Sequence, residues 1–184
     1  MNLNQIASIS SGINERRNPQ GSIYYLGGSD FIAPHQLEPH LKPSIMPSSK
    51  LEKHFLNKGD VLILSKGHHG FTAHCYQASK QPAVASSIFM VLHHIKPIVL
   101  PEYIAWYINL DTTQRTLINY SRGSALPAIN KKILSELAIE IPDLKTQESI
   151  VALDHFKKKE SKIINQLDQL KATKLEILLK SKIQ

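Results

Sequence analysis

The last 42 residues of the chain, residues 143–184, contain neither glycine nor proline, whereas the residues before them hold all 8 glycines and all 10 prolines. Gly and Pro interrupt helices and mark turns, so this break predicts a loop-rich body followed by one long helix. At ~1.5 Å per residue the helix would reach on the order of 55 Å. A body of this size cannot bury such a helix, so something outside the body must cover its apolar residues.

The body alternates short apolar runs with turn signals. These runs predict strands at residues 23–26, 61–64 and 86–93, with residues 71–76 as the hairpin partner of the second strand. Residues 137–141 alternate apolar and polar side chains and stop at Pro142, which predicts a strand that leads out of the body.

Two helices are predicted inside the body. Pro101 and Glu102 open the first, because proline is favoured at the first helical position; its apolar face consists of Tyr103, Ile104, Tyr107, Ile108, Leu117 and Ile118. Asn130 is suited to capping a second, short helix over residues 131–134. The fold class is therefore α+β, with a globular domain of mixed strands and short helices at residues 1–142 and one long C-terminal coiled-coil helix at residues 143–184.

The C-terminal helix carries an apolar seven-residue repeat typical of coiled coils. Glu160 and Lys174 interrupt the stripe and are suited to fixing its register or direction. Four further residues widen it beyond a strict two-stranded seam, which favours a coiled coil that also docks other helices: Ile164, Leu175, Leu178 and Leu179. The alternative is a helix folded back on its own body. The residues expected to form the dimerisation surface are Leu153, Phe156, Ile163, Ile164, Leu167, Leu170 and Ile177.

The composition predicts the cellular compartment and shows how the net charge is distributed along the chain. There is a single cysteine, Cys75, no apolar run long enough to span a membrane and no signal-peptide pattern at the N-terminus, so a cytoplasmic protein is expected. Of the net charge of +7, residues 145–184 contribute +4 from nine lysines and five acidic residues, which leaves +3 for the rest of the chain. This charge permits a nucleic-acid partner without requiring one.

No catalytic or metal site is expected. Cys75 beside His74 is interpreted as a strand residue and not as a nucleophile. The adjacent pairs His68–His69 and His93–His94 would point to opposite faces of a strand and chelate poorly. Lys66 and Gly67 lack the glycine pattern of a phosphate loop. The chain is therefore not expected to be an enzyme, to bind a metal or to hold a cofactor.

The order of several motifs resembles the specificity subunit of type I restriction–modification enzymes. The resemblance rests on Gly123–Ser124–Ala125–Leu126–Pro127–Ala128–Ile129, then Ile139–Glu140–Ile141–Pro142–Asp143–Leu144, then Gln147, Glu148 and Ile150 before a long helix. Upstream, Leu3–Asn4–Gln5–Ile6–Ala7, Tyr24–Tyr25–Leu26 with Asp30, and Leu56–Asn57–Lys58–Gly59–Asp60–Val61–Leu62 agree with it. It spans essentially the whole chain.

Members of that family usually hold two target-recognition domains and two conserved helices, whereas this chain has one of each. The resemblance implies a half-length specificity subunit that forms a homodimer through antiparallel C-terminal helices, each domain reading one half of a bipartite site in double-stranded DNA. It also implies that methyltransferase subunits bind S-adenosylmethionine and carry out methylation, with the restriction subunit as a further candidate partner.

Candidate DNA contacts follow from side-chain chemistry, because base-reading loops diverge most within the family. Arg suits guanine edges and phosphates, and loops that precede helices can hold phosphate through backbone N–H groups. We therefore expect DNA contacts from Arg16, Arg17, Lys66, His68, His69, Ser121, Arg122, Gly123, Lys131 and Lys132.

Two alternatives remain open from the sequence. The chain could be an interaction or regulatory protein that sequesters methyltransferase or specificity subunits through its helix without reading DNA. It could also be a nuclease or metal hydrolase that uses His68, His69 and Asp60. Methyltransferase binding without DNA binding would favour the first, and cleavage lost on mutating those three residues would favour the second.

Overall fold

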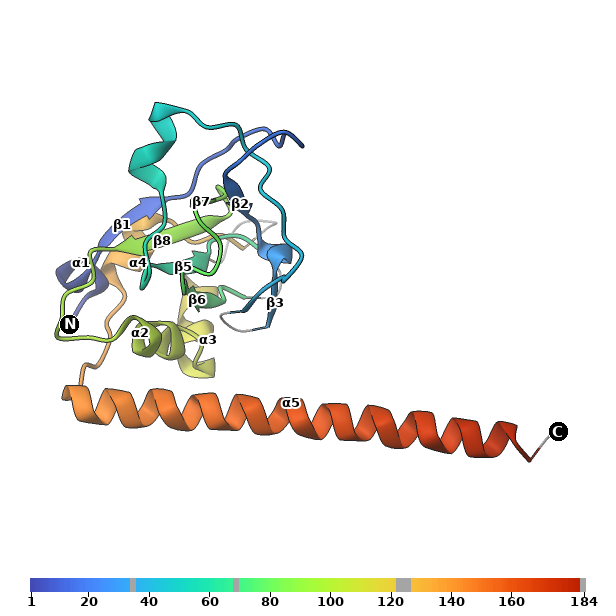
Figure 1. The fold of residues 1–184 in the computed structure, drawn as a ribbon. Helices are drawn as coiled ribbons and strands as arrows, with labels where there is room; N and C mark the ends of the chain where they lie inside the picture. Colours follow the sequence, from blue (N-terminus) through green and yellow to red (C-terminus); the bar gives the residue numbers. More distant parts are fainter. Residues whose placement is uncertain (34–35, 68–69, 122–126, 183–184) are drawn as a thin grey trace.

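A computed structural model describes residues 1–33, 36–67, 70–121 and 127–182. It consists of a mixed body and one long helix, α5, that runs past the body (Figure 1). The predicted α+β class is confirmed. The strands are β1 Ser8–Ser11, β2 Tyr24–Leu26, β3 Phe31–Ala33, β4 Gln36–Leu37, β5 Val61–Leu64, β6 Ala73–Cys75, β7 Ala83–Ala85 and β8 Phe89–His93. The helices are α1 Leu3–Ile6, α2 Pro101–Ile108, α3 Asp111–Tyr120, α4 Lys131–Glu136 and α5 Leu144–Lys180, with 3₁₀ turns η1 Gly28–Asp30 and η2 Ser49–His54.

The centre of the body is a four-stranded antiparallel sheet in the order β1-β8-β5-β6. The prediction of a strand at residues 61–64 is confirmed by β5, which pairs with β8 on one side and with its hairpin partner β6 on the other. β5 is apolar throughout and almost entirely buried because both faces of the sheet are covered.

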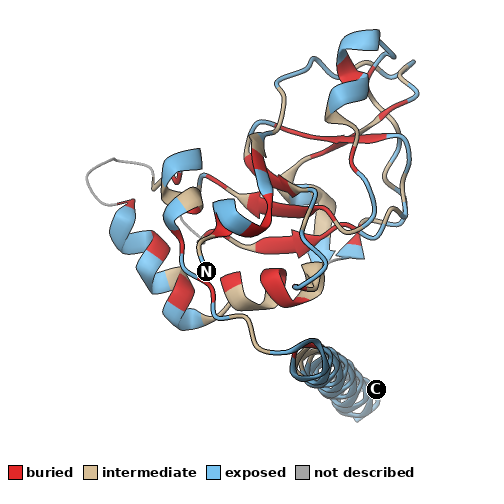
Figure 2. Ribbon diagram, turned by 90° about the vertical axis from the view of Figure 1, so that its left-hand side faces the viewer, coloured by how far each residue is buried: buried red, intermediate tan, exposed pale blue. Residues whose placement is uncertain are grey.

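The two faces of the sheet pack against different layers. Alternate residues such as Val61 and Ile63 join a core with α1, α2, α3 and α4, whereas Leu62 and Val91 join a second core with β2 and β7. β2 and β7 form a separate parallel pair. Figure 2 shows the buried residues of the strands between the helices and this second layer.

The helix that begins at Pro101 is confirmed, but its predicted apolar face does not continue through Ile118. The chain breaks into α2 and α3 at Asn109, whose side chain accepts a hydrogen bond from the Ala73 N–H and donates one to the Ala73 carbonyl, each at 2.8 Å. The Asn109 side chain therefore pairs with the backbone of the edge strand β6 at the point where α2 ends, and Ile118 is left 41% exposed.

The predicted strand at residues 137–141 is wrong. The segment is extended, but Ala138 makes only an isolated bridge with Asn2, and the Ile139 N–H donates to the Met1 carbonyl. The N-terminal residues are too short a partner to extend the pairing into a ladder. The short helix after Asn130 is confirmed as α4, and the Asn130 side chain caps it by accepting from the Ile133 N–H.

The long C-terminal helix is confirmed as α5, which has 37 residues and would measure about 55 Å at 1.5 Å per residue. Asp143 caps it by accepting from the Thr146 N–H at 3.0 Å and the Thr146 hydroxyl at 2.7 Å. These bonds lower the pKa of Asp143. Within the described ranges, no helix has both the length and the apolarity that crossing a membrane requires.

Candidate nucleic-acid interface

The structure describes six of the ten predicted DNA-binding residues. His68, His69, Arg122 and Gly123 lie outside the described residues. Ser121 is buried, and its hydroxyl donates a hydrogen bond to the Ile118 carbonyl at 2.8 Å, which terminates α3. Its side chain therefore already has a partner inside the body. The remaining five are exposed cations: Arg16, Arg17, Lys66, Lys131 and Lys132.

The turn that carries Lys66 is joined to the segment that leads into α4. The Ile129 N–H donates to the Ser65 carbonyl at 2.9 Å, and the Gly67 N–H donates to the Pro127 carbonyl at 3.2 Å. Lys66 itself forms an isolated bridge with Ala128. The fold thus brings the Lys66 turn beside the start of α4, where Lys131 and Lys132 lie.

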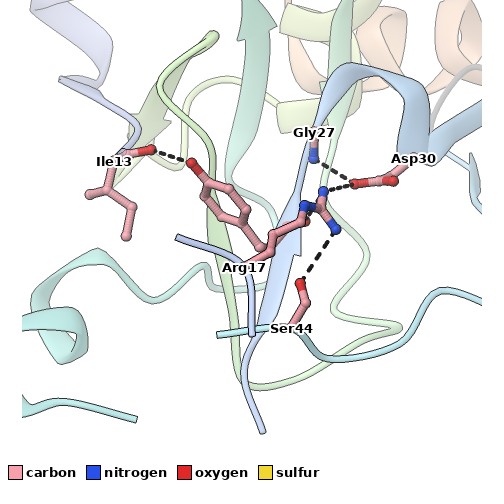
Figure 3. A network of polar contacts seen from close by, with 6 residues as sticks. Ile13, Arg17, Gly27, Asp30 and Ser44 are labelled. Carbon is pink, nitrogen blue, oxygen red and sulfur yellow. Dashed lines mark hydrogen bonds and ion pairs between the residues drawn. The ribbon is translucent and has the colours of Figure 1, made fainter. Parts of the chain in front are cut away.

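Arg17 belongs to a loop at residues 13–21, here called the Arg16 loop, and is bonded to the body (Figure 3). One guanidinium nitrogen donates to the Asp30 carboxylate and the Tyr25 carbonyl, and the other to the Ser44 hydroxyl, all at 3.3 Å. The guanidinium carbon lies 5.3 Å from the centre of the Tyr25 ring, within cation–π range.

Arg16 differs from its neighbour. It is exposed, and the described residues offer it no hydrogen bond or ion pair. Two adjacent arginines that the sequence places in one group are therefore separated by the structure, one bonded within the protein and one directed to solvent.

The Arg16 loop follows β1 and the Lys66 turn follows β5. In the register with β8, Ser11 of β1 lies opposite Met90 and Leu64 of β5 lies opposite Phe89, so both segments leave the sheet at the same end. β5 ends at Leu64, two residues before Lys66. We call this region the loop end of the body. Its exposed cations can neutralise phosphates or donate to base edges.

A hydrogen-bonded array that sequence reasoning missed links three strands of the sheet. His93 Nδ1 lies 2.9 Å from Asp60 Oδ2, and His93 Nε2 lies 3.0 Å from the Ser10 hydroxyl. Asp60 also accepts from the Asn57 N–H at 2.9 Å. The order Ser–His–Asp is that of a hydrolytic triad. Its hydrogen bonds join β1, β8 and the start of β5, and we interpret the array as a clamp across the sheet.

The structure also bears on the two other kinds of chemistry considered from the sequence, a reactive cysteine and a metal site. Cys75 is buried in β6, and this burial together with the nearby Glu102 raises the pKa of the thiol, which keeps it protonated and unreactive. Among the described residues, no group of three or more His, Cys, Asp or Glu side chains is arranged to hold a metal ion.

The apolar stripe of α5 is exposed to solvent. The seven residues predicted for dimerisation have exposed fractions from 48% at Leu167 to 69% at Leu153, the others being Phe156, Ile163, Ile164, Leu170 and Ile177. Figure 1 shows α5 running past the body and continuing beyond it towards the C-terminus. Within the described residues, the helix is not folded back over the body.

The attachment of α5 depends on Gln147, another residue whose role sequence reasoning missed. Gln147 is fully buried. Its amide nitrogen donates to the Ile98 and Pro142 carbonyls at 3.0 and 2.8 Å, and its amide oxygen accepts from the Leu100 N–H at 2.8 Å. The available signal was a glutamine one turn after a capping aspartate.

Comparison with known proteins gives one family. Residues 2–172 match the model of the type I restriction modification DNA specificity domain. No curated protein matches the chain.

Among solved structures, one that concerns complex assembly and conformational transition of the type I R-M system has a TM-score of 0.61 and 18% identity over 89% of this chain and 39% of that chain. The HsdS subunit from Thermoanaerobacter tengcongensis has a TM-score of 0.60 and 20% identity over 86% and 37% of the two chains. The type I S subunit from M. genitalium has values of 0.54 and 12%, over 83% and 37%. The chain spans less than two fifths of each, and at these identities the likeness shows the fold alone.

Proposed function

Because this chain belongs to the type I restriction–modification DNA specificity family, we propose that it reads DNA sequence for such a system and leaves catalysis to partner subunits. The observation that carries the proposal is the apolar stripe of α5, which the body leaves exposed and which gives the DNA-reading domain a surface for assembly. The protein would act in the cytoplasm, where methyltransferase and DNA are both present.

We propose that two copies pair through antiparallel α5 helices. In one antiparallel register the apolar residues 153–177 of the two helices overlap along their whole length. The twofold axis then lies at the level of Asn165, so that Leu153 meets the partner's Ile177 and Ile163 meets the partner's Leu167. Glu160 then lies one layer from the partner's Lys174, and the two polar interruptions have opposite charges. Isologous pairing of this kind is the commonest oligomer geometry.

In such a pair the two bodies lie at opposite ends of the helices. Each loop end would read one half of a bipartite site, and the helices would set the length of the unread spacer. The cations proposed to contact DNA are Arg16, Lys66, Lys131 and Lys132, and His68, His69, Arg122 and Gly123 stay predictions in segments that the structure does not describe.

Methyltransferase subunits are the proposed second partner of α5. Leu175, Leu178 and Leu179 are 53–58% exposed and, with Ile164, extend the apolar surface beyond the width that one partner helix covers. Helices of a methyltransferase subunit would cover this remainder, and S-adenosylmethionine would be bound by that subunit. A restriction subunit would join through the methyltransferase.

Light scattering on the purified chain, alone and with a methyltransferase subunit, tests the assembly. We expect a dimer that Ile163→Asp with Leu170→Asp converts to folded monomers. Ser161→Asp with Ala172→Asp adds the same charge on the opposite face of α5 and should leave the dimer intact. A dimer that survives the first pair of changes contradicts the helix pairing.

DNA binding separates this proposal from the regulatory alternative. A DNA-reading subunit should bind duplex DNA with an affinity that falls steeply as the salt concentration rises, because its Lys and Arg side chains displace the counterions that are condensed on the DNA phosphates. A chain that binds methyltransferase but no DNA would instead be a sequestering protein.

A further inference from the structure

The Arg16 loop is held to the body at Ile13 and at Arg17, which lie on either side of Arg16 in the sequence (Figure 3). Before it, the Tyr25 hydroxyl donates to the Ile13 carbonyl at 2.9 Å and accepts from the Glu15 N–H at 3.2 Å. After it, the Asn18 N–H donates to the Ser44 carbonyl at 2.7 Å. The backbone that carries Arg16 is therefore fixed, although the segment has no helix or strand of its own between β1 and β2.

Arg17 adds three further contacts to this attachment. Its guanidinium joins the loop to β2 through the Tyr25 carbonyl, to η1 through Asp30 and to a distant loop through Ser44. The Asp30 carboxylate is itself held by the Gly27 N–H at 2.7 Å and has only 14% of its side chain exposed. Three of the five guanidinium N–H donors are therefore already used within the protein, although 49% of the Arg17 side chain stays exposed.

Arg16 lies between two residues that are tied to the body, yet its own side chain is exposed. A cation on fixed backbone loses less conformational freedom on binding than one on a mobile loop, which is the advantage of preorganisation. Lys66 lies in a turn that leaves the sheet at the same end.

We propose that the Arg16 loop is a preorganised DNA-reading element in which Arg16 contacts the DNA and Arg17 is a positioning residue that does not. This inference rests on the proposed DNA binding. The acceptor for Arg16 is an oxygen or nitrogen on DNA, either a phosphate oxygen or the major-groove edge of a guanine.

Replacing Asp30 should change the DNA affinity in the opposite direction from the one that net charge alone predicts. Removing a carboxylate near a DNA surface should strengthen binding if only net charge matters. If Asp30 instead holds Arg17 in place, Asp30→Asn loosens the Arg16 loop and weakens binding. The exposed Glu15 beside Arg16 is a matched control, because only its backbone N–H is used in the loop.

The test measures binding of a pool of short randomised DNA duplexes across a salt series. For Arg16→Ala we expect the slope of log affinity against log salt to fall by about 0.9 if a phosphate is lost. If a guanine edge is lost, the sequences enriched from the pool should lose a preference instead. For Arg17→Ala, Arg17→Lys and Asp30→Asn we expect roughly tenfold weaker binding with an unchanged slope. Glu15→Gln should bind as tightly as the wild type or more tightly.

Two results overturn the inference while DNA binding stands: tighter binding by Asp30→Asn, or a slope that falls for Arg17→Ala as it does for Arg16→Ala while Arg17→Lys retains it. A melting curve for each variant ensures that the body is folded at the assay temperature. A wild-type chain that binds no duplex at any salt concentration overturns the proposed function, and this inference with it.

Discussion

Replacing Gln147 should loosen the joint between α5 and the body. The change Gln147→Ala removes three hydrogen bonds and leaves the Leu100 N–H and the Ile98 and Pro142 carbonyls without that partner. The side chain is fully buried, so it is not replaced by bulk water without rearrangement. Ile150 and Val151 would still pack on the core next to α2.

The magnitude follows from the three bonds. A hydrogen bond in a folded protein contributes about 1 kcal/mol net, and more when its loss leaves a buried group unpaired. Ile98 is 46% exposed, so its carbonyl can turn towards water and recover part of that loss. We therefore expect the free energy of unfolding to fall by about 2–3 kcal/mol, which corresponds to a melting temperature lower by roughly 4–12 °C in a chain of this size.

A variant of the same shape isolates the polar contribution. Gln147→Glu keeps an acceptor for the Leu100 N–H but places a carboxylate oxygen 2.8–3.0 Å from two carbonyl oxygens. Burial and these carbonyls favour the protonated form and raise the pKa of the new carboxyl. Relative to the wild type, the variant should therefore be least destabilised below about pH 4 and more destabilised as pH rises through the raised pKa.

Urea unfolding at one fixed protein concentration measures these changes, since dimerisation would itself add stability. Far-ultraviolet circular dichroism reports the helices, and fluorescence of Trp106, the single tryptophan, reports α2 beside the joint. The exposed neighbour Glu148→Ala is the control and should stay within about 0.5 kcal/mol of the wild type. If Gln147→Ala also stays within that range, the anchoring role is refuted.

Three further outcomes are expected. His93→Ala should lower the free energy of unfolding by about 1–3 kcal/mol, because Asp60 is 5% exposed and loses its ring partner; an unchanged urea midpoint would contradict the clamp. Asp143 has a lowered pKa, so its cap stabilises the fold above about pH 4 and is lost as pH falls through the folded-state pKa; thermal melts of Asp143→Asn should show a weaker acid dependence than those of the wild type. Splitting the dimer with Ile163→Asp and Leu170→Asp should weaken binding to a bipartite site by a factor on the order of 100 or more, measured by fluorescence anisotropy, whereas equal affinities would exclude joint reading by two bodies.

The sequence predicted the elements whose cause is local. β5 follows from four consecutive apolar residues, α4 from a capping asparagine, and α5 from the absence of Gly and Pro. The sequence did not predict the elements whose ends depend on hydrogen bonds to a segment far away in the chain. The Asn109 side chain pairs with the Ala73 backbone where α2 ends, and among the described residues the segment 137–141 forms no ladder, only an isolated bridge with the first residues of the chain. Neither partner can be identified from the segment itself.

The candidate site shows the same limit at the level of single side chains. The sequence grouped Arg16 with Arg17 by proximity and charge, and chemistry alone gives no reason to separate them. The separation comes from Asp30 and Ser44, which lie 13 and 27 residues further along the chain. In the same way, Ser121 suited a phosphate contact by type, but it is buried and bonded to the end of its own helix.

Under the proposed function, DNA binding by the body depends on how the C-terminal helix positions it. The residues before 145 carry a net charge of only +3, so a few placed cations must supply the DNA affinity of one body. Coupling two bodies raises that affinity only if both can reach their half-sites at once, and this requires a fixed distance and direction between them. The helix pair can fix the distance, but the direction depends on the joint at Gln147. Loosening this joint should therefore weaken binding to a bipartite site, although Gln147 is neither a cation nor exposed to DNA, and should leave binding to a single half-site unchanged.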